Sequence, residues 1–196
     1  MRDTDYRQAK KLEDVLEISK SDWSIHSEAR NNCLMRLAKD SESVSELGVN
    51  QGTSFIFMML QNPKKIVGVD RNLKKWRKGG TYPALEPLAL EYMKKHPMEY
   101  IMYEGNSLDK ESVHNVDMLH IDSLHTPAHL RQELKVHAES VNKYIAFHDT
   151  KLGNKETKSQ FALWKVVEQF LNDNPQWELE EHYTEGKCGH AAIRRA

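Results

Sequence analysis

Cysteine is scarce in this chain of 196 residues: Cys33 and Cys188 are too few and too far apart to predict a disulfide framework or a zinc site. No apolar run approaches the roughly 20 residues of a membrane-spanning helix, and the charged N-terminus, MRDTDYRQAKKLEDV, lacks the apolar core of a signal peptide. Neither sign of charge dominates, with 28 Lys and Arg against 29 Asp and Glu, so no global field directs the chain to a partner. These absences predict a cytoplasmic protein that binds neither nucleic acid nor a membrane.

What the sequence does contain is an alternation of strand-like and helix-like segments, in a chain long enough for one sizeable core. The runs IVGV and YIAF are continuously apolar, as central strands of a parallel sheet are. The alternation predicts an α/β fold, with a mainly parallel sheet covered by helices on both faces. The expected strands are 44–47, 65–69, 98–103, 117–121 and 144–147, and the expected helices between them are 53–61, 83–96, 108–115 and 128–140.

The two ends of the chain depart from that alternation. Helices are expected over 5–20 and 28–39, so we expect residues 1–40 to form an N-terminal helical cap on a main unit of residues 41–196. After a loop at 150–159 and a helix at 160–172, the strand-like runs 177–183 and 191–194 flank a turn at Gly186 and predict an antiparallel hairpin. The cap and the hairpin are the candidate contact surfaces of a homo-oligomer.

A glycine turn, SELGVNQGTS, follows the first strand. Glu46 lies at the strand's end, Gly48 and Gly52 punctuate the turn, and Thr53 or Ser54 can cap the next helix. Glycine lets the backbone approach a ligand closely, and a helix start offers free N–H groups. The turn therefore suits a nucleotide-like ligand, although packing alone also accounts for two glycines in a strand–turn–helix unit.

Two further strand ends carry residues that suit a nucleoside. Asp70 closes KKIVGVD about 20 residues beyond the turn, where an acidic residue can accept hydrogen bonds from ribose hydroxyls; capping of the next helix is the alternative. EYIMYEGNS ends in Asn106 and Ser107, a small polar turn that can read an adenine edge. Gly-Asn is, however, also an ordinary turn dipeptide.

The fourth and fifth strands end in carboxylates and imidazoles. MLHIDSLHT places Asp122 at a strand end with His125 three residues later, and YIAFHDT ends in His148 and Asp149. Two carboxylates and an imidazole suit Mg²⁺ or Mn²⁺ with open positions for substrate, and such an ion can activate a bound hydroxyl. The ordinary pKa of histidine makes His125 the candidate base. His120, inside its strand, is expected to pack in the core.

The segments SELGVNQGTS, GVD, EGNS, HIDSLHT and FHDT, in this order, resemble class I S-adenosylmethionine-dependent methyltransferases. More narrowly, they resemble a small O-methyltransferase-like group that is similar to the metal-dependent macrolide-sugar O-methyltransferases and to catechol O-methyltransferases. The resemblance covers roughly residues 41–195. It implies a Rossmann-like sheet of seven strands in the order 3-2-1-4-5-7-6, with the seventh strand antiparallel.

The resemblance also implies roles for individual residues. The cofactor would be S-adenosylmethionine, with a divalent metal beside it and a sugar or other hydroxylated metabolite as acceptor. Asp122 and His125 would be catalytic, and Asp122, His148 and Asp149 would bind the metal. The cofactor would be bound by Glu46, Gly48, Asn50, Gly52, Thr53, Asp70, Asn106, Ser107 and Asp122.

The chain departs from the group's pattern at three places, and these keep alternatives open. Ser123 stands where the group prefers glycine, VNKYIAF lacks the usual Pro-Gly-Gly, and His148 replaces an acid, which predicts weaker metal binding or none. The leading interpretation is a metal-assisted O-methyltransferase. The alternatives are a metal-dependent hydroxylase or hydrolase-like protein on the same scaffold, and a non-catalytic cofactor-binding subunit. A nicotinamide dehydrogenase is disfavoured because the turn is Gly-x-x-x-Gly rather than Gly-x-Gly-x-x-Gly.

Overall fold

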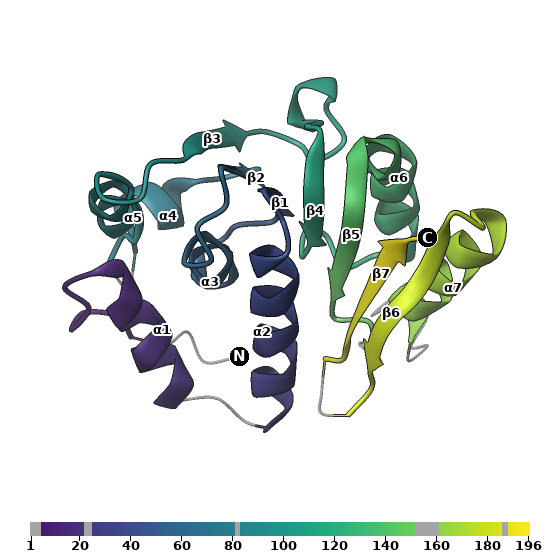
Figure 1. Cartoon of the computed structure of the whole chain (residues 1–196), viewed down its shortest axis with the longest axis horizontal. Coiled ribbons are helices and arrows are strands. Elements are labelled where there is room, and N and C mark those ends of the chain that lie inside the picture. Colours follow the sequence, from purple (N-terminus) through teal and green to yellow (C-terminus); the bar gives the residue numbers. More distant parts are fainter. Residues whose placement is uncertain (1–4, 22–24, 81–82, 152–160, 186–187) are drawn as a thin grey trace.

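A single seven-stranded sheet organises the computed structural model, which describes residues 5–21, 25–80, 83–151, 161–185 and 188–196. Its strand order is β3-β2-β1-β4-β5-β7-β6 (Figure 1), with β1 to β5 parallel and β7 antiparallel to both of its neighbours. The predicted fold is therefore confirmed. The strands are β1 (Ser43–Leu47), β2 (Lys65–Asp70), β3 (Glu99–Glu104), β4 (Val116–Ile121), β5 (Val141–His148), β6 (Trp177–Tyr183) and β7 (His190–Arg195).

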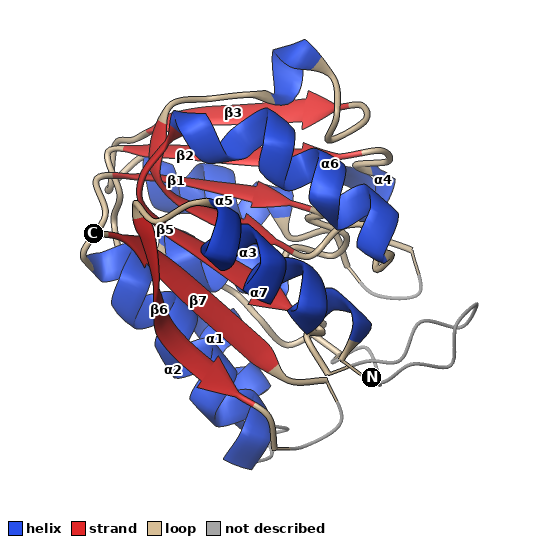
Figure 2. Cartoon of the chain, turned by 90° about the vertical axis from the view of Figure 1, so that its right-hand side faces the viewer, coloured by secondary structure: helices blue, strands red, loops and turns tan. Residues whose placement is uncertain are grey.

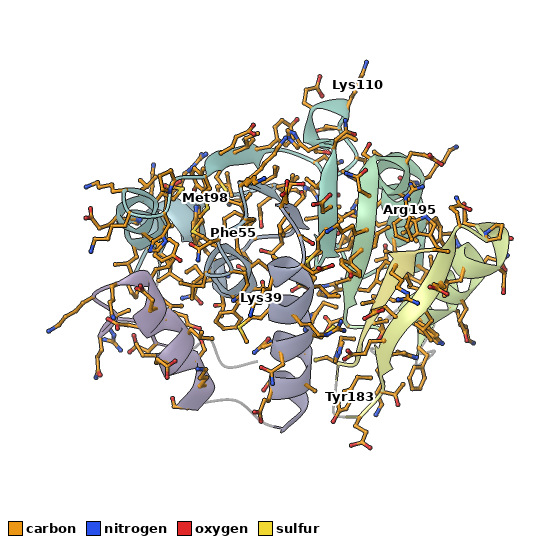
Figure 3. All side chains as sticks on the ribbon, in the orientation of Figure 1. Lys39, Phe55, Met98, Lys110, Tyr183 and Arg195 are labelled. Atoms are coloured by element: carbon orange, nitrogen blue, oxygen red, sulfur yellow. The ribbon has the colours of Figure 1, made fainter. Side chains whose placement is uncertain are left out.

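Helices cover both faces of the sheet (Figure 2). The helices form two groups, one on each face, and each group covers its own hydrophobic core. Successive strand residues face opposite layers, so Ala146 of β5 belongs to the core under the first group, while Ile145 and Phe147 belong to the core under the second. Side chains fill these layers, with Phe55 in the interior and Lys110 projecting from the edge (Figure 3). The first group is α1 (Leu12–Ser21), α2 (Ile25–Lys39), α3 (Thr53–Met59), α4 (Lys74–Lys78) and α5 (Glu86–Met93); the second is α6 (Pro127–His137) and α7 (Ala162–Asp173). Within the described residues, no helix is long and apolar enough to cross a membrane.

The helix predicted over 108–115 is wrong. That connection holds only the short 3₁₀ turn η1 (Lys110–Ser112). The Ser112 hydroxyl donates to the carbonyl oxygens of Ser107 and Asp109, at 2.9 and 2.6 Å. Such bonds from a side chain to the backbone compete with helical hydrogen bonds, and they hold the segment as a tight turn.

Other predicted boundaries shift. The first helix begins at Leu12 rather than at residue 5, the helix at 83–96 shortens to α5, and η2 (Ala138–Ser140) ends the helix predicted over 128–140. The basic residues of α4 lie on a helix, as expected for a solvated helix face, but its Trp76 is fully buried and donates through Nε1 to the Tyr100 hydroxyl at 2.8 Å. The loop predicted at 150–159 and the turn at Gly186 lie largely outside the described residues.

Candidate functional site

The glycine turn lies directly against the end of β4. Gly48 has φ 96°, and a Cβ atom there would lie 2.2 Å from the carbonyl oxygen of Asp122. Gly52 has φ 93°, and its Cβ would lie 2.2 Å from the Trp76 ring. Close packing thus requires both glycines, and the Gly48 contact joins the turn to the strand end that carries Asp122. The capping prediction is wrong: Gly52 is itself the N-cap of α3, and the described residues provide no side-chain hydrogen bond to that cap.

Glu46 is a fully buried carboxylate beneath the turn. Its Oε1 accepts hydrogen bonds from Ser54 Oγ at 2.6 Å and from His120 Nδ1 at 2.8 Å. Its Oε2 is buried and has no hydrogen-bond partner among the described residues. Burial raises the pKa of Glu46 above its ordinary value. The turn therefore leaves one buried acceptor oxygen available to a hydrogen-bond donor of a ligand.

Asp70 ties the turn to the end of β2. Its Oδ2 accepts the backbone N–H of Asn50 at 2.7 Å, and its Oδ1 accepts that of Asn72 at 2.8 Å. An ionised carboxylate has about four acceptor positions, so both oxygens retain capacity for the two hydroxyls of a ribose. Thr53, the first residue of α3, lies with its hydroxyl 3.2 Å from that of Tyr6, which brings the N-terminal segment onto the turn.

The two residues predicted to read adenine have different surroundings. Asn106 is exposed, whereas Ser107 is buried and donates from Oγ to Glu133 Oε1 at 2.6 Å. Ser123 donates to the same oxygen at 2.5 Å. Glu133, on α6, thereby connects the loops that follow β3 and β4. It was not predicted, and no feature of the sequence around it signals a buried acid.

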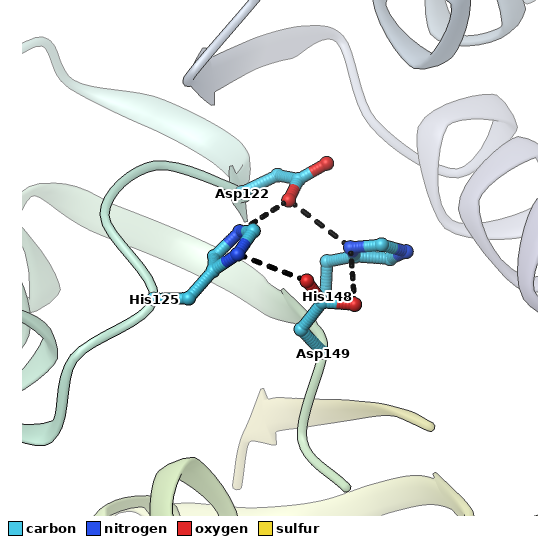
Figure 4. A group of neighbouring side chains, drawn as sticks. All are labelled: Asp122, His125, His148 and Asp149. Carbon is cyan, nitrogen blue, oxygen red and sulfur yellow. Dashed lines mark hydrogen bonds and ion pairs between the residues drawn. The ribbon is translucent and has the colours of Figure 1, made fainter. Parts of the chain in front are cut away.

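At the ends of β4 and β5, the structure brings together Asp122, His125, His148 and Asp149 (Figure 4), here termed the Asp–His cluster. His125 bridges the two carboxylates, with Nε2 2.9 Å from Asp122 Oδ1 and Nδ1 3.0 Å from Asp149 Oδ2. His148 Nδ1 lies 3.0 Å from Asp122 Oδ1 and 3.0 Å from Asp149 Oδ1. Asp149 adopts φ 59°, a left-handed conformation that is uncommon among residues other than glycine. Four residues from two strand ends thus converge on one point.

The charges of the cluster determine the state of His125. Hydrogen bonds to Asp122 and Asp149 raise the pKa of His125 to about 10. Burial opposes ionisation of Asp122, but the His148 and His125 rings hold the pKa of Asp122 well below its usual range. In this arrangement His125 is protonated at neutral pH, so it can accept a proton only after its carboxylate partners are engaged elsewhere.

Arg30, on α2, contacts the cluster through His148. One terminal guanidinium nitrogen lies 2.5 Å from His148 Nε2. Burial lowers the pKa of His148, while the charges of Asp122 and Asp149 favour the protonated ring. A guanidinium only donates, however, so Nε2 must accept, and we assign the neutral ring with its proton on Nδ1. The sequence contains no signal for Arg30, which lies 118 residues from its partner.

Two buried atoms of the cluster, His148 Nδ1 and Asp149 Oδ1, have no hydrogen bond of acceptable geometry within the part of the chain that the structure describes. One ligand atom from each of the four residues lies within 4.8 Å of the others. Carboxylate oxygens are the ligands that Mg²⁺ and Mn²⁺ prefer, so Asp122 and Asp149 fit such an ion. His148 could ligate through Nδ1 only after losing its proton, which the Arg30 contact opposes.

The whole fold resembles solved methyltransferase structures. A putative caffeoyl-CoA O-methyltransferase from Staphylococcus aureus matches with TM-score 0.67 at 13% identity, over 96% of this chain and 94% of that one. An O-methyltransferase from Bacillus cereus, in complex with SAH, matches with TM-score 0.59 at 15% identity, over 94% and 90%. A putative O-methyltransferase from Klebsiella pneumoniae matches with TM-score 0.57 at 18% identity, over 95% and 90%. No protein-family profile matches the sequence, and no match to it was found among curated proteins. The architecture is the class I methyltransferase fold.

Proposed function

We propose that the chain is an S-adenosylmethionine-dependent O-methyltransferase that methylates a hydroxyl of a sugar or another hydroxylated small molecule. The observation that carries the proposal is the contact between Gly48 and the Asp122 backbone. Through this contact, the turn, which has an available hydrogen-bond acceptor in Glu46 Oε2, adjoins the cluster that can hold the hydroxyl to be methylated. A methyl donor bound at the turn would therefore face a nucleophile bound at the cluster.

In this proposal the cofactor lies along the carboxyl ends of β1 and β2. Glu46 Oε2 would accept hydrogen bonds from the methionine end of the cofactor. That end would also contact the residues of the turn, Gly48, Asn50, Gly52 and Thr53. Asp70 would accept the two ribose hydroxyls. Asn106 would contact the adenine. The buried Ser107 would help to hold this loop near the adenine through its hydrogen bond to Glu133. The SAH in the Bacillus cereus and Podospora anserina structures supports the same cofactor class for this chain.

The proposed reaction is an in-line displacement. The acceptor oxygen forms a bond to the methyl carbon while the carbon–sulfur bond breaks, S-adenosylhomocysteine leaves as a neutral thioether, and the hydroxyl proton passes to His125. Holding the two reactants in line is the main contribution of the protein to the rate. The residues of the Asp–His cluster would orient the oxygen.

His125 must be neutral to act as the base. Its two carboxylate partners keep it charged in the present arrangement, so the base is released when Asp122 and Asp149 are engaged by something else. A divalent ion at these carboxylates would polarise the acceptor hydroxyl when bound. Arg30 would keep His148 neutral and fixed throughout.

Calorimetric titration and a transfer assay test the proposal. We expect S-adenosylmethionine to bind to the wild-type protein, and methyl transfer to appear across a panel of sugars and catechols with Mg²⁺ or Mn²⁺ and to fall with a chelator. Metal binding without cofactor binding would contradict the proposal and favour the hydroxylase or hydrolase-like alternative. Cofactor binding with no transfer across the panel would instead favour a non-catalytic subunit.

A further inference from the structure

A second group of side chains that could bind a metal lies between α2 and the C-terminal hairpin, next to the Asp–His cluster. Cys33 of α2, Glu181 of β6 and His190 of β7 each present one ligand atom, and these atoms all lie within 4.8 Å of one another. We propose that Cys33, Glu181 and His190 form a zinc site, separate from the Asp–His cluster, that joins α2 to the C-terminal hairpin.

A β-bulge brings the carboxylate into this group. The pairing of β6 with β7 shifts register between Leu179 and Glu181, so that Glu181 lies opposite Ala192. Ala192 belongs to the core on the α2 side of the sheet, and His190, two residues before it, shares that face. Glu181 and His190 are thus diagonal neighbours on one face, with Glu181 Oε1 2.9 Å from His190 Nε2.

A hydrogen bond from Arg36 orients the Glu181 carboxylate. Arg36, on α2, donates to Glu181 Oε2 at 3.1 Å and to Glu180 Oε1 at 2.7 Å. One oxygen of Glu181 is therefore held by a guanidinium while the other lies next to His190. An outer partner that fixes the orientation of a ligand in this way is a regular feature of metal sites.

The donor set selects the metal. A thiolate, an imidazole and a carboxylate together suit Zn²⁺, whereas the oxygen-rich Asp–His cluster suits Mg²⁺ or Mn²⁺. Cys33 and His190 are each 4% exposed, while the Glu181 side chain is 34% exposed. Three protein ligands leave a fourth, tetrahedral position, which would open on the Glu181 side for water.

An ion bound at this site would also affect the neighbouring Asp–His cluster. His190 is the strand partner of His148 in the β5–β7 pairing. Cys33 follows Arg30 by about one helical turn, so both lie on the same side of α2. An ion held by Cys33 would therefore fix the part of α2 that holds Arg30 against His148.

Cobalt substitution is the direct test, with the full chain first stripped by a chelator. We expect one equivalent of Co²⁺ to produce a thiolate-to-cobalt charge-transfer band, and Zn²⁺ to displace it with unit stoichiometry. Cys33→Ser should abolish the band, whereas Cys188→Ser, which changes the other thiol, should leave it intact. Arg36→Gln should weaken zinc binding by about 10- to 100-fold. Asp149→Asn, in the other cluster, should not alter the band.

The measurement on the wild-type protein does not depend on any variant folding. A wild-type spectrum without the charge-transfer band would overturn the proposal and leave the three side chains as a hydrogen-bonded network. A band that survives Cys33→Ser but disappears in Cys188→Ser would also overturn it. Because the readout is spectroscopic, it is independent of whether methyl transfer is found.

Discussion

The glycine turn and the Asp–His cluster meet at the Gly48–Asp122 contact, yet they are built in opposite ways. The turn is made of backbone: its shape follows from two glycines at positive φ. The N–H groups of Gly48 and Gly52 donate to the carbonyl oxygens of Val69 and Val49, and that of Asn50 donates to Asp70. The cluster is made of charged side chains whose protonation states depend on one another. The turn should therefore respond to changes of shape, and the cluster to changes of charge.

Removing the imidazole of His125 should have the largest effect on the cluster. We expect His125→Gln to lower kcat by roughly 10²- to 10⁴-fold, the usual contribution of a general base, and to leave the Kd for S-adenosylmethionine nearly unchanged. Steady-state kinetics and calorimetry on the same preparation measure both. His96→Gln, at an exposed histidine stacked on Tyr92, is the control. A parallel loss of cofactor affinity would show that the turn and the cluster are not separable.

A single methyl group at the contact should break the turn. Gly48→Ala places Cβ against the Asp122 carbonyl in a backbone conformation that disfavours side chains, so we expect the free energy of unfolding to fall by about 3 kcal/mol and cofactor binding to be lost. Denaturant unfolding gives the first value and calorimetry the second. Gly80→Ala is the matched control, because a Cβ there meets no described residue within 4 Å. Equal stabilities of the two variants would contradict the proposed steric role.

The same contrast explains what could be predicted from the sequence. The positions of Asp70, Asp122 and Asp149 were predictable because strand ends are local features and parallel strands end on one edge. The order of the sheet was predicted from the resemblance to class I methyltransferases, because local spacing does not specify which strands are neighbours. The contacts of Arg30 and Glu133 were not, since each is made across the fold between residues with no shared motif. The predicted helix at 108–115 failed for a related reason: hydroxyl-to-backbone bonds decided the local structure, and helical spacing does not report them.

Asp70 gives a smaller and more selective effect on the turn. Asp70→Ala removes a charged acceptor, so we expect the affinity for S-adenosylmethionine to fall by about 10- to 100-fold. Asp117→Ala is the matched control, because Asp117 also accepts a backbone N–H, from Glu42 at 2.9 Å, but at the opposite end of the sheet. Calorimetric titration of both variants decides. An equal loss of affinity in the control would trace the effect to general destabilisation rather than to a ribose contact.

The smallest expected effect is a pH dependence that only the cluster should produce. Because the carboxylates raise the pKa of His125 to about 10, its charged ring stabilises the fold fully below the unfolded pKa of about 6.5, and this contribution is lost as the pH rises through about 10. His125 is 41% exposed, so solvent screening limits the contribution to about 1 kcal/mol or less. The free energies of unfolding of the wild type and of His125→Gln should therefore differ more at pH 7 than at pH 10.5. A difference that does not change with pH would mean that the charge of His125 between Asp122 and Asp149 does not stabilise the fold.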